Sequence, residues 1–260
     1  MNEETPLNPA DVLGLPERAR LSERLTKRLL RDQVGGDARS TPDRRLVDRA
    51  VASAQVVGIL RPETILVPVY RDRGRDGTGD REISDIAVLH LRLNPKIATS
   101  DRRRLVELVQ RAMPRPVVLF LDGPDLPGEL ALAFTHVSRT DPEKRTSVID
   151  ATITVPVTEL PDGALDITRC DRTDLWALYR DLVRIAATAG RPASAALGAD
   201  EAVQLHHRLA ALHAELDAVA REAKRARSQQ SRIALNTTAK VLRQQIATVR
   251  TSLYSADPSQ

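Results

Sequence analysis

Hydrophobic residues recur in alternating steps of four and three along the C-terminal part of the chain. Residues 200–256 contain neither Gly nor Pro, and this spacing places apolar side chains in one stripe along a helix. We therefore expect this segment to make helix–helix contacts through coiled-coil-like seams. The first seam comprises Leu205, Leu209, Leu212, Leu216, Val219, Ala223 and Ala226, and the second comprises Leu235, Ala239, Leu242, Ile246, Val249 and Leu253.

The two seams are out of phase with each other. Ala226 and Leu235 lie nine residues apart, which is about half a turn at roughly 100° per residue. A continuous helix would show its seams on opposite sides and would need two different partners. A reversal within residues 228–236 would instead bring the seams together as a helical hairpin. The absence of Gly and Pro from this interval favours the continuous helix slightly.

The remaining pattern predicts an α+β body. Its sheet should be antiparallel or mixed, with about five strands flanked by helices. The first two strands are expected to pair as a β-hairpin with a long tip. The predicted helices are 16–32, 41–54, 100–112 and 171–188, and the predicted strands are 64–70, 83–93, 117–121, 129–137 and 147–157. The domain boundaries predicted are a flexible N-terminus at 1–15, the body at 16–190, a linker at 191–199 and the helical segment at 200–256.

Basic residues gather beside the seams. Residues 220–253 contain eight Arg and Lys against one acid, Glu222, and this surplus exceeds the net charge of +4 of the whole chain. Such a helix can follow phosphates without reading base sequence, or it can dock on an acidic protein. A solvated helix face is the plainer alternative. The candidates for contact with nucleic acid or an acidic partner are Arg221, Lys224, Arg225, Arg227 and Arg232.

Composition narrows the cellular setting. The chain is 42% hydrophobic but only 2% aromatic, so its core must be mainly aliphatic. The single cysteine, Cys170, is expected to be a packing residue and suits a reducing compartment. No apolar run approaches the roughly 18 residues needed to span a bilayer, and the acidic, polar first residues do not resemble a signal peptide. We expect a cytoplasmic protein with no membrane association.

One catalytic alternative is present. The order helix, two strands, helix, strand partly resembles a PD-(D/E)XK nuclease core, and Asp80, Glu82 and Asp85 cluster near the start of a strand. Magnesium-dependent cleavage of a phosphodiester needs acids around the metal, usually with a nearby lysine. That lysine is missing after Glu82 and Asp85. His90 and His136 are expected to be hydrogen-bonded structural residues. The sequence thus favours a non-catalytic protein without a cofactor or metal.

Several short motifs resemble a bacterial family known as domain of unknown function 4391. They are Arg-Pro-Glu-Thr-Ile at 61–65, the strand at 82–93, the segment RAMPRPVVLFL, and the basic, Gln-rich stretch at 227–236 that ends in Leu235-Asn236. The likeness spans residues 45–250. The chain departs from the family in its Arg/Gly-rich insertion at 71–80, its extended N-terminus, and the absence of an aromatic residue before Asn236 in the closing helix. The resemblance implies a genomic context beside helicases and DNA methyltransferases in phage-defence loci, and it implies no catalytic residues.

These observations together predict a non-catalytic accessory subunit of an anti-phage or restriction-type complex. Its C-terminal helices would dock through their seams onto a helicase or methyltransferase partner, with DNA phosphates as a further, non-specific contact. Two alternatives stay open. One is a metal-dependent nuclease that uses Asp80, Glu82 and Asp85, and the other is a coiled-coil homodimer with no nucleic-acid role.

Overall fold

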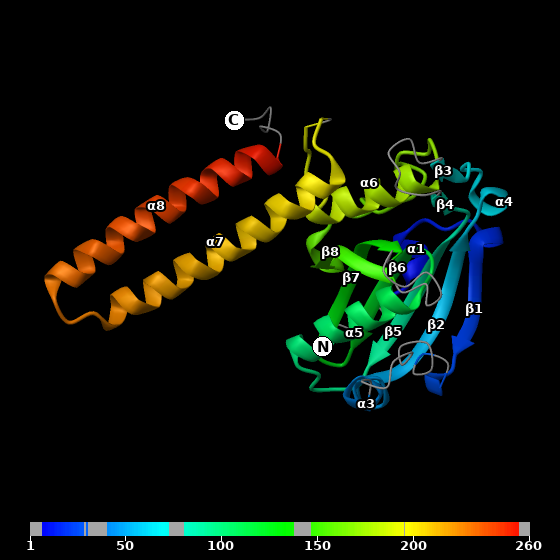
Figure 1. Cartoon of the computed structure of the whole chain (residues 1–260), viewed down its shortest axis with the longest axis horizontal. Coiled ribbons are helices and arrows are strands. Elements are labelled where there is room, and N and C mark those ends of the chain that lie inside the picture. The colour runs from blue at the N-terminus through cyan, green and yellow to red at the C-terminus, as the bar shows by residue number, and fades with distance from the viewer. Residues whose placement is uncertain are drawn as a thin grey trace. The chain divides into compact units, whose positions relative to one another are not determined.

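The computed structural model describes residues 7–28, 30, 41–72, 81–137, 147–194 and 196–254. The chain divides into two compact units, Met1–Gly190 and Arg191–Gln260 (Figure 1). The first unit holds the sheet and the shorter helices, and the second holds two long helices. Each unit is described by itself below.

A six-stranded mixed sheet forms the centre of the first unit. Its strand order is β1-β2-β5-β6-β7-β8. Every neighbouring pair is antiparallel except β5 and β6, which run parallel because the helix α5 connects them as a crossover. The strands are β1 Arg20–Leu25, β2 Val51–Leu60, β5 Ile86–Leu93, β6 Val117–Gly123, β7 Leu126–Val137 and β8 Ser147–Pro156. A separate two-stranded hairpin pairs β3 Tyr70–Asp72 with β4 Arg81–Ile83.

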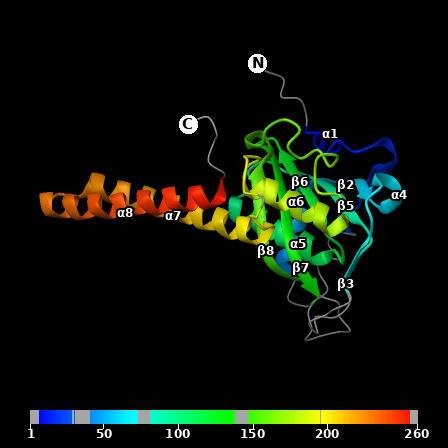
Figure 2. The ribbon, with the colours of Figure 1, turned by 90° about the horizontal axis from the view of Figure 1, so that it is seen from above.

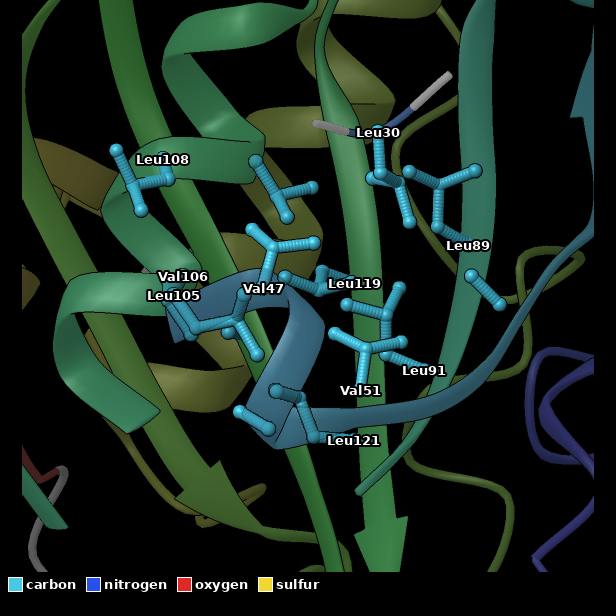
Figure 3. Packing of buried hydrophobic residues seen from close by; sticks show 14 of the residues in the cluster. Leu30, Val47, Val51, Leu89, Leu91, Leu105, Val106, Leu108, Leu119 and Leu121 are labelled. Atoms are coloured by element: carbon cyan, nitrogen blue, oxygen red, sulfur yellow. The ribbon is translucent and has the colours of Figure 1, made fainter. Parts of the chain in front are cut away.

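Helices α3 and α5 cover one face of this sheet with an aliphatic core. Successive residues of a strand point to opposite faces, so Leu89 and Leu91 of β5 lie beside Leu119 and Leu121 of β6 in the same cluster (Figure 3). The helices contribute Val47 and Leu105 among others, as the low aromatic content predicted. The helices of this unit are α1 Pro9–Val12, α3 Thr41–Ala50, α4 Pro62–Ile65, α5 Thr99–Ala112 and α6 Leu175–Ala187.

The N-terminal segment and α6 lie on the second face. The segment passes very close to the sheet, since a Cβ added to Gly58 would lie 2.7 Å from Cδ1 of Leu15. A Cβ on Gly128, whose φ is +118°, would lie 3.2 Å from Cδ2 of Leu7. Glycine suits Gly128 because other residues rarely adopt its positive φ, and it suits Gly58 because an added Cβ would also lie 3.0 Å from the backbone carbonyl of Ala19.

Tyr179 of α6 reaches between two strands of the sheet. The last paired residues of β6 and β7 towards this end are Leu119 and Ala131. Beyond them the Tyr179 hydroxyl accepts from the amide of Ala133 at 3.0 Å, and it can donate to the carbonyl of Ala133 at 2.9 Å or of Val117 at 3.2 Å. The hydroxyl thus replaces ladder hydrogen bonds where the two strands separate.

Two long antiparallel helices form the second unit. Helix α7 spans Ala199–Arg225 and α8 spans Gln229–Leu253, and they pack side by side as a hairpin (Figure 2). The mixed sheet flanked by helices and followed by a helical hairpin confirms the predicted fold class. At the open end of the hairpin, the Arg191 guanidinium lies 5.1 Å from the ring centre of Tyr254.

The hairpin corrects the slight preference for one continuous helix, and the chain reverses at 226–228, earlier than the start of the predicted interval by two residues. Gly and Pro are dispensable here because Ser228 caps α8, accepting from the amide of Ser231 at 3.0 Å. Nε of Arg232 also donates to the carbonyl of Ala226 at 3.0 Å. Both Ala226 and Ser228 take extended backbone angles that any residue can adopt.

The N-terminal predictions were wrong in two places. Residues 7–15, expected to be flexible, contain α1, and Leu13 and Leu15 are buried. The predicted helix 16–32 is instead β1 over Arg20–Leu25, paired with β2 at the edge of the sheet. Its alternating charges suit an exposed edge strand, and pairing with β2 overrides the helical spacing of the leucines.

Two further predictions failed between residues 41 and 93. The helix predicted to reach residue 54 ends at Ala50, and the β-branched stretch that follows becomes β2. The predicted strand 64–70 is mostly α4 and a loop, since Pro62 suits the first helical turn and the Thr64 hydroxyl accepts from the amide of Arg61 at 2.9 Å. Consequently β5 pairs with β2 and β6, and only the short β3–β4 hairpin forms beside it.

Tyr179→Phe should lower the free energy of unfolding by about 1–3 kcal/mol, because it leaves the buried amide of Ala133 without its acceptor. Urea unfolding followed by circular dichroism measures this loss. Tyr254→Phe is the matched control, since the ring that faces Arg191 is kept and little change is expected. Equal stability of the two variants would contradict the role assigned to the hydroxyl.

Candidate functional site

The turn of the hairpin gathers the basic residues that charge counting had singled out. Arg221, Lys224 and Arg225 belong to the end of α7, Arg227 lies in the turn, and Arg232 lies near the start of α8 (Figures 1 and 2). All five are exposed. We call this group the basic tip. Glu222 is the only acid within it, so its formal charge is strongly positive.

Helix α8 extends this positive charge away from the tip. It contains Arg232, Lys240, Arg243 and Arg250 and no acidic residue, and no acid occupies its first turn. The amides of a helix N-terminus carry partial positive charge, so the start of α8 adds to the potential of the tip. An anion approaching the turn therefore meets side-chain and backbone groups of one sign.

Arg232 has a structural role that the other four basic residues lack. Its Nε donates to the carbonyl of Ala226 and so helps to close the turn. Within the part of the chain that the structure describes, Arg221, Lys224 and Arg225 form no ion pair, and neither does Arg227. Their charged groups are consequently free to bind an anionic partner.

The apolar seams of α7 and α8 pack mainly against each other within the hairpin. Leu212, Leu242, Ile246 and Val249 form its buried cluster. The burial of the seam residues decreases towards the turn, where Leu235 is only partly buried. A partner or a second copy could reach the buried seam residues only if the hairpin opened. Leu253 of the second seam is also buried, whereas Leu205, Leu209, Leu216 and Val219 pack at the border of the cluster and are partly exposed.

Two apolar side chains of α8 point away from the seam. Ile233 is 59% exposed and Val241 is 47% exposed. Ile233 directly follows Arg232, so an apolar group adjoins the basic tip.

Of the three acids of the nuclease alternative, the structure describes Glu82 and Asp85, and each of these is paired with arginine. Asp80 lies outside the described residues. Glu82 pairs with Arg71 at 3.6 Å, and Asp85 pairs with Arg115 and, at 4.0 Å, with Arg61. Among the described residues, no group of three or more His, Cys, Asp and Glu side chains could hold a metal ion. The two described carboxylates therefore neutralise guanidinium groups.

The histidines on strands lie apart, and each meets an aspartate. Nε2 of His90 lies 3.2 Å from Oδ1 of Asp122, on the neighbouring parallel strand. Nδ1 of His136 lies 2.7 Å from Oδ1 of Asp150, across β7 and β8. Sequence reasoning missed Asp122, although an acid near the C-terminal end of a buried strand such as β6 indicates a polar group where the strand leaves the sheet.

Cys170 is buried and chemically shielded. Burial, together with the nearby carboxylates of Asp181 and Asp166, raises the pKa of its thiol to about 12. A nucleophilic cysteine needs the opposite shift. Cys170 is therefore unsuited to covalent catalysis, in accord with a packing role.

The sequence model of one protein family matches most of the chain. Its description is "Domain of unknown function (DUF4391)", and the match covers residues 13–246. No curated protein and no solved structure shows a significant match to the chain. Within the described ranges, the helices are all too short or too polar to cross a membrane.

The native thiol of Cys170 should react with a disulfide reagent much more slowly than a free cysteine, because at pH 8 it is almost fully protonated and is only 7% exposed. The absorbance change with Ellman's reagent measures this rate. The same protein in concentrated urea is the control and should react at once. Fast reaction of the folded protein would show that the thiol is accessible.

Proposed function

The chain belongs to the family of domain of unknown function 4391, and from this premise we propose that it is a non-catalytic accessory subunit of an anti-phage or restriction-type complex. In this proposal the basic tip contacts DNA phosphates. The outer faces of the hairpin bind a helicase or DNA methyltransferase partner. The proposal rests on the hairpin, because the family match itself names no activity.

The observation that carries the DNA contact is the gathering of four unpaired basic side chains at one turn. Arg221, Lys224, Arg225 and Arg227 are exposed, and no described carboxylate neutralises them. Binding of such a group to a duplex releases condensed counterions, so it is strong at low salt and indifferent to base sequence. Backbone contacts of this kind position a protein on DNA, while other subunits read the sequence.

The partner contact is supported by the apolar residues beside the tip. Ile233 and Val241 lie on the outer side of α8, whereas the seam residues are enclosed. A partner with an apolar groove could cover both residues without disturbing the hairpin. An accessory subunit of this design would hold its partner and DNA with one helical hairpin.

Neutralising the tip should abolish most binding to a labelled duplex. The variant carries Arg221→Gln, Lys224→Gln, Arg225→Gln and Arg227→Gln, and it leaves Arg232 to close the turn. If all four side chains touch phosphates, the slope of log K against log salt should fall in magnitude by about 3–4. Fluorescence anisotropy from low to moderate salt provides the measurement.

The control removes the same charge from the shaft of the hairpin. It carries Arg208→Gln, Lys240→Gln, Arg243→Gln and Arg250→Gln, all at exposed positions. This variant should keep most of the affinity and the slope. Equal losses in the two variants would mean that only total charge matters, and absence of binding by the unmodified protein at low salt would refute the DNA contact.

Ile233→Glu combined with Val241→Glu should release the partner protein in co-purification from cells that express both. Each glutamate would place a charge in the apolar contact. Burying an unpaired charge there is strongly unfavourable, whereas the same charge is well solvated in the free protein. Ala210→Glu with Ala218→Glu is the control, with the same added charge and the same spacing at exposed positions of α7. Retention of the helicase or methyltransferase by the first variant would disprove docking through this face.

A further inference from the structure

A row of polar residues crosses the second face of the sheet where the N-terminal segment leaves it open. Arg24 of β1 pairs with Gln55 of β2, and Gln55 pairs with His90 of β5. Arg92 lies two residues beyond His90 on the same face and pairs with Asp122 of β6. We call these five residues the polar strip. Arg24, Gln55 and Arg92 are exposed, whereas His90 and Asp122 are mostly enclosed.

The enclosed pair of this strip is only partly satisfied. The side chains of His90 and Asp122 are 11% and 12% exposed. Their facing atoms, Nε2 and Oδ1, are buried and lie 3.2 Å apart, but the contact is not an aligned hydrogen bond. Because the two atoms face each other, the pair is a loose internal contact of the strip.

Asp122 faces one nitrogen of the His90 ring. Because that nitrogen is Nε2, Nδ1 is the nitrogen left for another partner.

Two guanidinium groups flank the ring. The Arg92 side chain is 61% exposed, and its Nε lies 3.6 Å from Oδ1 of Asp122, so this pairing is loose. Arg24 forms no ion pair with any residue that the structure describes. Neighbouring strands lie about 4.8 Å apart, which lets both long side chains reach a group bound above Gln55. Two arginines against one aspartate leave the strip net positive.

We propose that the polar strip binds a phosphate group. Guanidinium N–H groups of Arg24 and Arg92 match the oxygens of a phosphate in geometry and charge. The amide of Gln55 and the ring of His90 supply further polar contacts. A metal ion fits less well, because the described residues offer no third His, Cys, Asp or Glu ligand there and Arg92 already faces the carboxylate.

This site is separate from the basic tip, since it belongs to the sheet of the first unit. Its phosphate could belong to a small phosphomonoester or to a nucleic-acid backbone. The chemistry of recognition is the same for both. The tip-neutralised variant allows the two sources to be compared without binding at the hairpin.

The test follows the histidine ring signals by NMR in the full-length, tip-neutralised protein. The loss of one signal in His90→Gln assigns the ring of His90 among the five histidines. Inorganic phosphate, a nucleoside monophosphate and a short duplex are added in turn at constant ionic strength. The His90 signal should shift and saturate while the His136 signal stays unchanged.

Arg24→Gln and Arg92→Gln should each weaken the saturating response by about tenfold or more, because each removes a charge-assisted hydrogen bond. Arg103→Gln is the matched control at an exposed position of α5, and it should bind as the parent does. Saturation by phosphate and the monophosphate alone identifies a small ligand, and saturation by the duplex identifies a backbone. A His90 signal that does not saturate with any of the three, or that saturates in the Arg24 and Arg92 variants at the same concentrations as in the parent, overturns the proposal.

Discussion

The hydroxyl of Tyr179 lies where the helices on the two faces of the sheet, α6 and α5, both reach the backbone of β6 and β7. It forms hydrogen bonds with backbone groups of Val117 and Ala133 from the side of α6. Gln110 of α5 reaches the carbonyls of Val117 and Ala131 from the opposite face, at 3.3 and 3.4 Å. Because backbone groups buried in a sheet must be paired, the separation of β6 and β7 is tolerated only with these two side chains in place. The positions of α5 and α6 are therefore fixed by the same gap in the ladder.

Local periodicity was sufficient to predict the elements from α5 onwards, but not the reversal of the chain between α7 and α8. Helix α5, strands β6 to β8 and the two seams all follow from spacing that needs no knowledge of distant contacts. The failures concentrate at Arg20–Leu25 and Val51–Leu60, which pair with each other. In β1 only Leu25 packs against the core cluster, so the same residues satisfy a helical or a strand pattern equally well. Tertiary pairing decides between them, and one sequence does not reveal it.

The basic tip and the polar strip also differ in how far the sequence predicts them. The basic tip could be found by counting charges, because its residues are close in sequence, and the hairpin adds only their compact arrangement around a turn. The pairing of His90 with Asp122 depends on β5 and β6 lying parallel and in one particular register. Neither this topology nor this register can be read from residue type or spacing.

The contact between Arg191 and Tyr254 means that the chain enters and leaves the hairpin at one place. Segments whose two ends lie together can be inserted into a surface loop of another protein without stretching that loop. The hairpin is thus a self-contained segment that could be transferred between proteins. Matched insertions in α7 and α8 could change its length without altering the contact between Arg191 and Tyr254 at its open end. Lengthening of this kind would alter how far the turn reaches while its chemistry stayed the same.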